Sequence, residues 1–241
     1  MRMFAGPNGS GKSVLKSYLP EPLLGVYLNP DEIEKGVKER GYVDLHSFGI
    51  QSTAAEVLPV VASSEFLIQQ DLKEAASSLS FAEGRLHFPP GVINSYFASE
   101  VADFMRGQLL AMQRTFTFET VMSHPGKAAL LKKAQEVGYR TYLYYVATDD
   151  PAINISRVEN RVRLNGHHVP PDLVEKRYHR SLDLLISAIR FTNRAYIFDN
   201  SADNADRAHT WLAEITDGRR LELKTDHIPV WFKRSVLDKI V

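Results

Sequence analysis

The sequence predicts an α/β fold in which a mostly parallel central sheet lies between layers of helices. Short apolar segments typical of strands alternate with helical patterns, and a glycine-rich segment separates the first strand from the first helix. Parallel neighbours need crossover connections, so this alternation favours a parallel sheet with helices on both faces. The 241 residues suffice for one domain with a well-buried core, and we expect a single domain over residues 1–241.

The first elements are short and end at recognisable stop signals. We expect a strand, a helix and a second strand, at residues 1–5, 12–19 and 26–28. Asn29 and Pro30 then form a favourable N-cap and first-turn pair. A helix is therefore predicted from Pro30 to Arg40, with Gly41 ending it.

The middle of the chain has a mainly helical pattern. Apolar residues recur at helical spacing from Val92 to Met105, and the segment Phe88-Pro89-Pro90-Gly91 interrupts the pattern as a loop. We expect an all-helical insertion at about residues 44–113.

The second half returns to alternating elements. Strands are predicted at residues 115–121, 140–148 and 195–198. Helices are predicted at residues 123–138, 151–164 and 170–189. The last two helices would form a lid at about 151–190, and a hairpin of 211–215 with 221–223 would belong to a C-terminal hairpin and helix segment at about 209–241.

The composition excludes several classes of protein. The 29 basic and 29 acidic side chains give a net charge of zero, which disfavours a nucleic acid partner or a membrane surface. The chain has no cysteine, and therefore no disulfide or thiolate metal site. It also shows neither a signal-peptide pattern nor an 18-residue apolar run, so we expect a cytoplasmic protein.

One motif carries most of the functional information. Residues Gly6 to Ser13 read GPNGSGKS, which matches the pattern G-x-x-x-x-G-K-S/T of phosphate-binding loops between a strand and a helix. Glycines let backbone amides approach phosphate oxygens, while Lys12 would reach the β- and γ-phosphates and Ser13 would bind Mg²⁺. This is the loop of a P-loop NTPase with three α/β/α layers, and its cofactors would be ATP and Mg²⁺. The residues expected to bind them are Gly6, Asn8, Gly9, Ser10, Gly11, Lys12 and Ser13.

Asp31 is the candidate catalytic base. It follows the second predicted strand, where an acceptor hydroxyl could meet the γ-phosphate, and a positioned carboxylate can take the proton of that hydroxyl. The alternative is that Asp31 and Glu32 only lie in the first turn of a helix, where their negative charges interact favourably with the helix dipole.

The end of the third strand supplies further polar residues. Glu119 follows Phe116 and Phe118, so its carboxylate is expected to be buried and to need partners. It could help hold Mg²⁺ or bind substrate together with Thr120 and His124, or its hydrogen bonds could be purely structural. For His124 the alternative is a role at the start of a helix.

Arginines on the predicted lid are candidates for phosphate contacts. Arg157 and Arg161 lie one helical turn apart, and Arg163 follows closely. A pair so placed can stabilise charge on a transferring phosphoryl group, although arginine clusters are as often solvated surfaces. The basic strip continues on the next helix with Lys176, Arg177 and Arg180.

His167 and His168 lie in the turn between the two lid helices. No second cluster of His or carboxylates has zinc-like spacing nearby, so we do not expect a metal site there. The pair is either a lid turn that contacts substrate or a plain loop.

Taken together, the segments GPNGSGKS, YLNPDEI, FTFET, RVENRV, NGHHVPPD and FDNS resemble the zeta-toxin-like family of P-loop kinases over about residues 1–201. The resemblance implies an aspartate base matched by Asp31 and lid arginines matched by Arg157 or Arg161. It also implies phosphorylation of a sugar hydroxyl on a nucleotide sugar such as UDP-N-acetylglucosamine, as in toxin–antitoxin pairs. An antitoxin-like inhibitor protein would then be a partner.

The sequence thus predicts an ATP- and Mg²⁺-dependent phosphotransferase with a small-molecule hydroxyl as acceptor, in which Lys12, Asp31, Arg157 and Arg161 act catalytically. One alternative is an NTP-dependent binding or switch protein with slow hydrolysis. Another is a nucleic-acid end kinase, which the neutral charge disfavours because polynucleotides usually demand several phosphate contacts.

Overall fold

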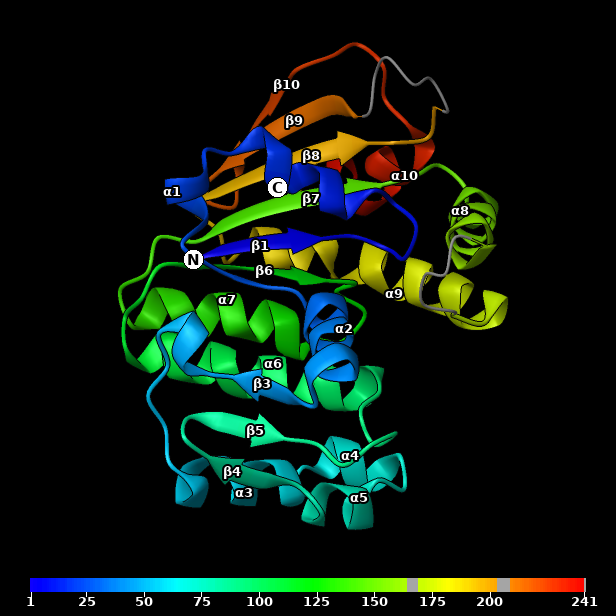
Figure 1. Ribbon diagram of the computed structural model, residues 1–241. Coiled ribbons are helices and arrows are strands. Elements are labelled where there is room, and N and C mark those ends of the chain that lie inside the picture. Colours follow the sequence, from blue (N-terminus) through cyan, green and yellow to red (C-terminus); the bar gives the residue numbers. More distant parts are fainter. Residues whose placement is uncertain (164–168, 203–208, 241) are drawn as a thin grey trace. The chain divides into compact units, whose positions relative to one another are not determined.

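The computed structural model describes residues 1–163, 169–202 and 209–240 (Figure 1). The chain divides into two compact units. The first unit comprises Met1–Leu24 and Thr117–Val241, and the inserted unit comprises Gly25–Phe116. That the two units behave as one domain stays a prediction.

The described strands of the first unit lie in one sheet, in the order β10-β9-β8-β7-β1-β6. Its strands are β1 (Arg2–Ala5), β6 (Phe116–Thr120), β7 (Tyr142–Ala147), β8 (Arg194–Asp199), β9 (Thr210–Thr216) and β10 (Arg220–Leu223). β1, β6, β7 and β8 run parallel, whereas β9 is antiparallel to both of its neighbours. The predicted α/β class and the predicted hairpin are therefore confirmed.

The short first strand lies between β6 and β7, which explains its apolar sequence. Met3, Phe4 and Ala5 are fully buried, as expected for a strand with neighbours on both sides. The carboxyl ends of the four parallel strands meet at one edge of the sheet, where ligands bind in folds of this kind.

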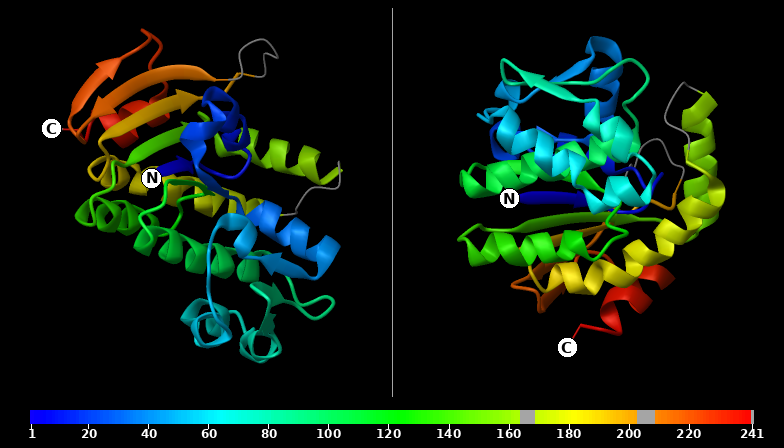
Figure 2. Two further views of the ribbon diagram at one scale, coloured as in Figure 1. Left: turned by 60° about the vertical axis from the view of Figure 1, so that its left-hand side comes forward. Right: turned by 90° about the horizontal axis from the view of Figure 1, so that it is seen from below.

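Helices cover both faces of this sheet (Figures 1 and 2). The short helix after the glycine-rich segment, η1 (Lys12–Tyr18), is a 3₁₀ helix of 7 residues that packs on β1 and β7. The opposite face carries α9 (Pro171–Ile189), which packs against α7 (Gly126–Glu136) and the C-terminal helical segment. The remaining helices of this unit are α1 (Glu21–Leu24), α8 (Pro151–Arg163), α10 (Val230–Phe232) and η3 (Lys233–Leu237).

The inserted unit differs from its prediction. Its helices are α2 (Pro30–Arg40), η2 (His46–Phe48), α3 (Ala54–Ala62), α4 (Glu65–Gln69), α5 (Lys73–Ser77) and α6 (Ser95–Ala111). It also contains β2 (Val26–Leu28) and an antiparallel sheet of β3 (Tyr42–Asp44), β5 (Arg85–His87) and β4 (Ser80–Ala82). The expectation of an all-helical insertion at 44–113 is therefore wrong.

The missed sheet has a local cause. Glu83 and Gly84 both have positive φ, 51° and 74°, the geometry of a two-residue hairpin turn between β4 and β5. The strands on either side have only three residues, which is too short to show a clear alternation of apolar and polar positions.

The helix α2 follows its sequence signals closely. Asn29 caps its start, because its side-chain oxygen accepts a hydrogen bond from the Asp31 amide at 2.9 Å. Gly41 ends it in the left-handed conformation, and its amide donates to the Val37 carbonyl at 2.7 Å. No helix in the described part of the chain is long and apolar enough to cross a membrane.

Candidate active site

The glycine-rich loop Gly6–Ser13 lies between β1 and η1, at the carboxyl edge of the sheet. Gly6, Gly9 and Gly11 have φ values of 145°, 74° and 94°, a region that side chains other than glycine rarely enter. The strand-loop-helix context that the motif requires is therefore present.

The same three glycines are also required by close packing. A Cβ atom on Gly6 would lie 2.0 Å from the Val146 carbonyl oxygen of β7. On Gly9 it would lie 2.5 Å from the Asn154 carbonyl oxygen of α8, and on Gly11 it would lie 2.4 Å from Asn200 Nδ2. The loop thus rests against β7, α8 and the residue after β8.

Lys12 folds back over the loop. Its Nζ donates to the carbonyl oxygens of Gly6 and Pro7, both at 2.8 Å. The ammonium group is thereby held at the loop, and oxygens of a phosphate could take the place of these carbonyls. Ser13 is exposed in the first turn of η1, which is shorter and tighter than the helix we expected.

Two asparagine side chains hold backbone carbonyls of the loop. Asn154 Nδ2 donates to the Asn8 carbonyl at 2.5 Å, and Asn200 Nδ2 donates to the Ser10 carbonyl at 2.9 Å. Asn154 is fully buried and accepts a hydrogen bond from the Thr148 hydroxyl.

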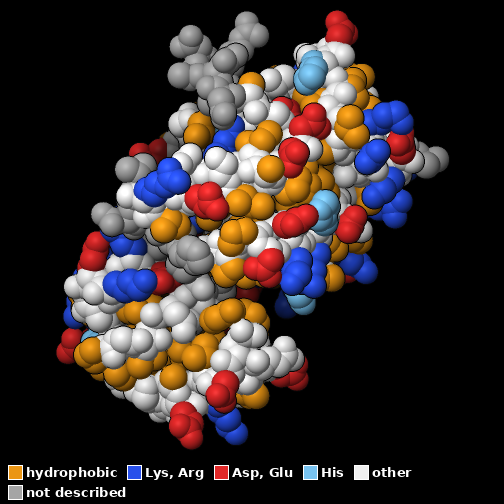
Figure 3. Space-filling view, turned by 90° about the vertical axis from the view of Figure 1, so that its right-hand side faces the viewer, with side chains coloured by type: hydrophobic (Ala, Val, Ile, Leu, Met, Phe, Trp, Pro, Cys, Tyr) orange, Lys and Arg blue, Asp and Glu red, His pale blue; other side chains and the backbone are white. Residues whose placement is uncertain are grey.

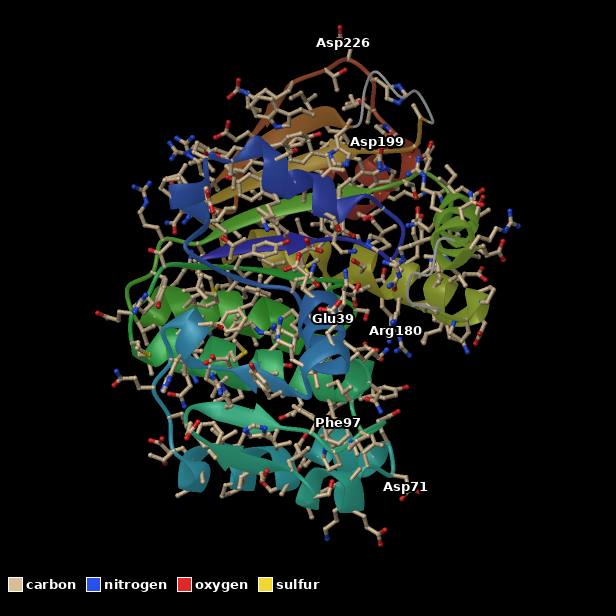
Figure 4. All side chains as sticks on the ribbon, in the orientation of Figure 1. Glu39, Asp71, Phe97, Arg180, Asp199 and Asp226 are labelled. Carbon is tan, nitrogen blue, oxygen red and sulfur yellow. The ribbon has the colours of Figure 1, made fainter. Side chains whose placement is uncertain are left out.

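The turn after β8 is fixed by a buried carboxylate. Asp199, labelled in Figure 4 at the end of β8, accepts hydrogen bonds from the Ser201 amide at 2.9 Å and the Ser201 hydroxyl at 2.8 Å. Its Oδ2 also accepts from Trp231 Nε1 at 2.8 Å. The Asn200 amide donates to the Ala147 carbonyl at 2.8 Å, so this turn is attached to β7 as well.

His209 completes the surroundings of the loop. Its Nδ1 lies 2.8 Å from the Tyr18 hydroxyl, and its ring packs against Tyr18 and Phe198. Burial, with a smaller contribution from the Arg157 charge, lowers the pKa of His209 to about 4. The ring is therefore neutral at pH 7.

Three buried polar atoms of these residues have no hydrogen-bond partner in the described part of the chain. They are Asn8 Oδ1, Ser10 Oγ and His209 Nε2. Such atoms are rare in folded proteins unless a ligand or ion satisfies them. Their concentration on the loop and beside it indicates a site for a polar ligand.

The neighbouring strand end brings Glu119 and Thr120 to the same edge. In the parallel pairing of β1 with β6, Glu119 lies opposite Phe4 and Thr120 opposite Ala5, the residue before the loop. Glu119 is buried, as predicted, with 7% of its surface exposed. The Thr120 hydroxyl oxygen accepts from the Met122 amide at 3.0 Å.

His124 has a local contact at the start of α7. The side chain is exposed, and its Nδ1 accepts a hydrogen bond from the Gly126 amide at 3.2 Å. This contact matches the helix-start alternative, and a substrate contact by His124 stays a prediction.

Of the candidate arginines, the structure brings Arg157 to the loop. Its Nη1 donates to the Asn200 carbonyl at 2.7 Å, next to the asparagine amide that holds Ser10. Arg161 and Arg163 are exposed near the end of α8, where Arg163 lies 3.5 Å from Asn160 Oδ1.

The basic residues of α9 are more dispersed. Lys176 pairs with Asp172 of the same helix at 3.4 Å, and Arg180, labelled in Figure 4, is exposed. Arg177 is half-buried. His167 and His168 lie outside the described residues.

Asp31 belongs to the inserted unit, where it is exposed in the first turn of α2. Its backbone amide takes part in the Asn29 cap, and the alternative of a helix-start residue therefore has direct structural support. The role of Asp31 as a base stays a prediction.

The described residues include no cluster of three or more His, Asp or Glu side chains that could hold a metal ion by themselves. Mg²⁺ usually binds through one or two protein oxygens together with phosphates and water. The hydroxyl of Ser13 and the carboxylate of Glu119 are oxygen ligands of that kind, so the predicted pair fits this mode of binding.

Sequence reasoning missed the asparagines and His209. The segment FDNS, which contains Asn200, was singled out only as part of a family resemblance, and Asn154 and His209 carried no signal of their own. Asn154 and Asn200 lie 146 and 190 residues along the chain from their partners in the loop.

The chain matches the model of a known protein family. The model of the zeta toxin family matches residues 92–215, slightly more than half of the chain. This segment contains Glu119, Arg157, Asn200 and His209, whereas the loop at 6–13 and Asp31 precede it.

Among the proteins similar to this chain are two solved structures and a protein sequence. A chain of the AvrRxo1-ORF1:AvrRxo1-ORF2 complex with sulphate ions has a TM-score of 0.53 at 11% identity, covering 99% of this chain and 62% of that chain. A chain from the PezAT chromosomal toxin–antitoxin system of Streptococcus pneumoniae has a TM-score of 0.45 at 12% identity, covering 88% and 70%. A Haemophilus influenzae protein is 32% identical over 63 residues, which is 26% of this chain and 45% of that protein. The chain thus spans less than two thirds of the length of the AvrRxo1 chain and less than half of the Haemophilus protein.

Proposed function

Because the chain belongs to the zeta toxin family, we propose that it is a phosphotransferase that moves the γ-phosphate of ATP to a hydroxyl group of a small molecule. The observation that carries this proposal is the loop Gly6–Ser13, which holds the Lys12 ammonium and has three unsatisfied polar atoms on it and beside it. The Lys12 ammonium and the Ser10 hydroxyl are hydrogen-bond donors, which a polyphosphate with several acceptor oxygens needs.

The cations of the site suit phosphoryl transfer. Charge develops on the oxygens of the transferring group, and catalysis relies mainly on orientation and on neutralising that charge. Lys12 would exchange its contacts with the Gly6 and Pro7 carbonyls for contacts with the β- and γ-phosphates. Arg157 is proposed as the first lid arginine, because it contacts Asn200, which holds the loop. Arg161 is proposed as the second lid arginine on its position one turn further along α8.

Mg²⁺ would be held by Ser13 and Glu119 together with phosphate oxygens and water. When bound, it would neutralise part of the charge of the triphosphate. Glu119 is already buried at the carboxyl end of β6, and a buried carboxylate is stabilised by a nearby cation.

Asp31 is proposed as the base. The acceptor oxygen would form a bond to the γ-phosphorus while the bond to the oxygen bridging the β- and γ-phosphates breaks, and ADP would leave. The proton of the acceptor hydroxyl would pass to the Asp31 carboxylate. The acceptor, contacted by Thr120 and His124, is proposed to be a nucleotide sugar such as UDP-N-acetylglucosamine, and an antitoxin-like protein is proposed as an inhibitor.

The test is a product assay. Purified protein with ATP, Mg²⁺ and a panel of nucleotide sugars should give a phosphorylated product by mass spectrometry. The Asp31→Asn variant should bind ATP with unchanged affinity but lose about 100-fold or more in kcat, the usual contribution of a general base. The Lys12→Ala variant should lose ATP binding itself.

Glu32→Gln is the matched control, because Glu32 is a carboxylate in the same helical turn and is also exposed. It should retain full activity. Full activity of Asp31→Asn would remove Asp31 as the base. Formation of only ADP and inorganic phosphate with every acceptor would favour an NTP-dependent switch protein with slow hydrolysis over a phosphotransferase.

A further inference from the structure

Two carbonyl groups of the loop Gly6–Ser13 are held by side chains distant in sequence. Asn154 on α8 holds the Asn8 carbonyl, and Asn200 after β8 holds the Ser10 carbonyl. Asparagine offers a neutral donor with a fixed planar geometry, which can orient a carbonyl without adding charge to a site that receives phosphates.

Orienting a carbonyl also orients the next amide. In a trans peptide the C=O of one residue and the N–H of the next point in opposite directions, and the loop peptides are trans. The bonds to Asn8 and Ser10 therefore turn the N–H groups of Gly9 and Gly11 away from the asparagines. Successive amides turned inward in this way form an anion-binding nest.

We propose that Asn154 and Asn200 are positioning residues that fix the Gly9 and Gly11 amides toward the phosphates before the nucleotide binds. The proposal rests on the proposed function, since it assigns to these residues the preorganisation of the same nucleotide site. Preorganised donors need no reordering when the ligand arrives, so binding is tighter than to a mobile loop.

Both asparagines are themselves held in place. Asn154 is fully buried and accepts from the Thr148 hydroxyl, and the Thr148 carbonyl accepts from the Tyr178 hydroxyl at 2.7 Å. Asn200 is attached to β7 through its amide and follows Asp199, which three hydrogen bonds fix. Supporting contacts of this kind are what keeps a positioning residue precise.

The Asn200 side chain can be removed without removing the acceptor of Arg157. Arg157 donates to the backbone carbonyl of Asn200, not to its side chain. The Asn200→Ala variant therefore removes the side-chain hydrogen bond to the Ser10 carbonyl. It keeps the backbone carbonyl that accepts from Arg157.

The experiment measures nucleotide affinity by calorimetry in the presence of Mg²⁺. ATP, ADP and AMP are compared for the parent protein and for Asn154→Ala, Asn200→Ala and the double variant. Each single variant should bind ATP and ADP about 3- to 10-fold more weakly, as expected for a lost hydrogen bond, and AMP binding should change less. The KM for ATP should rise more than kcat falls.

Asn160→Ala is the matched control, because Asn160 is an exposed asparagine on α8. It should leave all affinities unchanged. Hydrogen exchange of the Gly9 and Gly11 amides in nucleotide-free protein should be faster in the two asparagine variants than in the control. The thermal unfolding curve of each variant is also measured. The nucleotide affinities are then compared at a temperature at which all of the proteins are folded.

The outcomes separate the two proposals. If the parent protein binds no ATP, the proposed function fails. If the parent binds ATP but the folded asparagine variants bind it equally well, the positioning role is overturned and the kinase proposal stands. The positioning role is also overturned if the folded variants lose affinity for ATP and for AMP equally while the exchange of the Gly9 and Gly11 amides is unchanged.

Discussion

At the scale of single residues, His209 shows how the fold fixes a charge state beside the loop. Burial and Arg157 lower its pKa to about 4, against an ordinary value of 6.5, while Asp199 and the Gly11 backbone oppose the shift. The Tyr18 hydroxyl faces Nδ1. A neutral imidazole can contact the loop without competing with Lys12 for anionic groups.

This shift predicts a dependence of stability on pH. Between pH 6.5 and 4 the unfolded chain binds a proton at this position that the folded protein does not, so the stability contributed by neutral His209 is present above pH 6.5 and is lost as the pH falls. Because the ring is partly exposed, we expect a loss of roughly 1–2 kcal/mol between pH 7 and pH 5. The measurement is urea unfolding of the parent and of His209→Gln at both pH values.

The difference in unfolding free energy between parent and variant isolates His209, since all other titrating groups are common to both. That difference should shrink on going from pH 7 to pH 5. An equal loss of stability in the two proteins would show that His209 titrates normally in the folded state.

At the scale of elements, α9 is attached to the sheet by buried hydroxyl groups. Ser181 donates to the Val121 carbonyl at 2.8 Å and lies 3.0 Å from the Tyr145 hydroxyl, and Tyr178 donates to the Thr148 carbonyl at 2.7 Å. Val121 and Thr148 directly follow β6 and β7, so these bonds hold the long helix at the carboxyl edge. The apolar contact of Val158 with Val169 and Val174 then joins α8 to α9.

Removing the Ser181 hydroxyl should weaken this attachment. We expect Ser181→Ala to lower the free energy of unfolding by about 1–3 kcal/mol, because it leaves a buried hydroxyl and a carbonyl without a partner. The measurement is denaturant unfolding of Ser181→Ala, Tyr145→Phe and the double variant. Since the two side chains share one hydrogen bond, the double variant should lose less than the two single losses together.

A change of less than 0.5 kcal/mol in Ser181→Ala, a loss typical of surface substitutions, would contradict the structural role of this hydroxyl. Strictly additive losses would show that the Ser181 and Tyr145 hydroxyls act independently.

At the scale of the whole molecule, the charges balance and are dispersed. The chain has 29 basic and 29 acidic side chains, and both signs are interspersed over the face shown in Figure 3. Proteins that bind a polynucleotide concentrate several cations along the path of the backbone. The overall balance and the face shown in Figure 3 therefore disfavour a nucleic acid as the ligand.

This balance predicts the result of an oligonucleotide titration. By fluorescence anisotropy, a labelled single-stranded or double-stranded 20-mer should show no binding tighter than about 10 μM at physiological salt, the middle of the usual range of non-specific affinities. Lowering the salt to about 50 mM should change little, because few counterions would be released. If the logarithm of the affinity rises steeply and linearly as the logarithm of the salt concentration falls, the alternative of a nucleic-acid end kinase is supported.

The sequence by itself determined the features that depend on a few neighbouring residues. The caps of α2 at Asn29 and Gly41 and the loop after β1 are set by local hydrogen bonds and by glycine conformations, and all were predicted. The parallel sheet followed from the alternation of elements. The β4–β5 hairpin was missed because its three-residue strands carry too little pattern, although its turn at Glu83 and Gly84 is local.

Only the tertiary structure decided what surrounds the loop. Asn154, Asn200 and His209 meet the loop because β7 pairs with β1 and β8 pairs with β7, an order that no local sequence pattern records. The same order places Arg157 against the Asn200 carbonyl. A hydrogen bond between residues far apart in the chain depends on strand order and register, which the packing of the whole sheet determines.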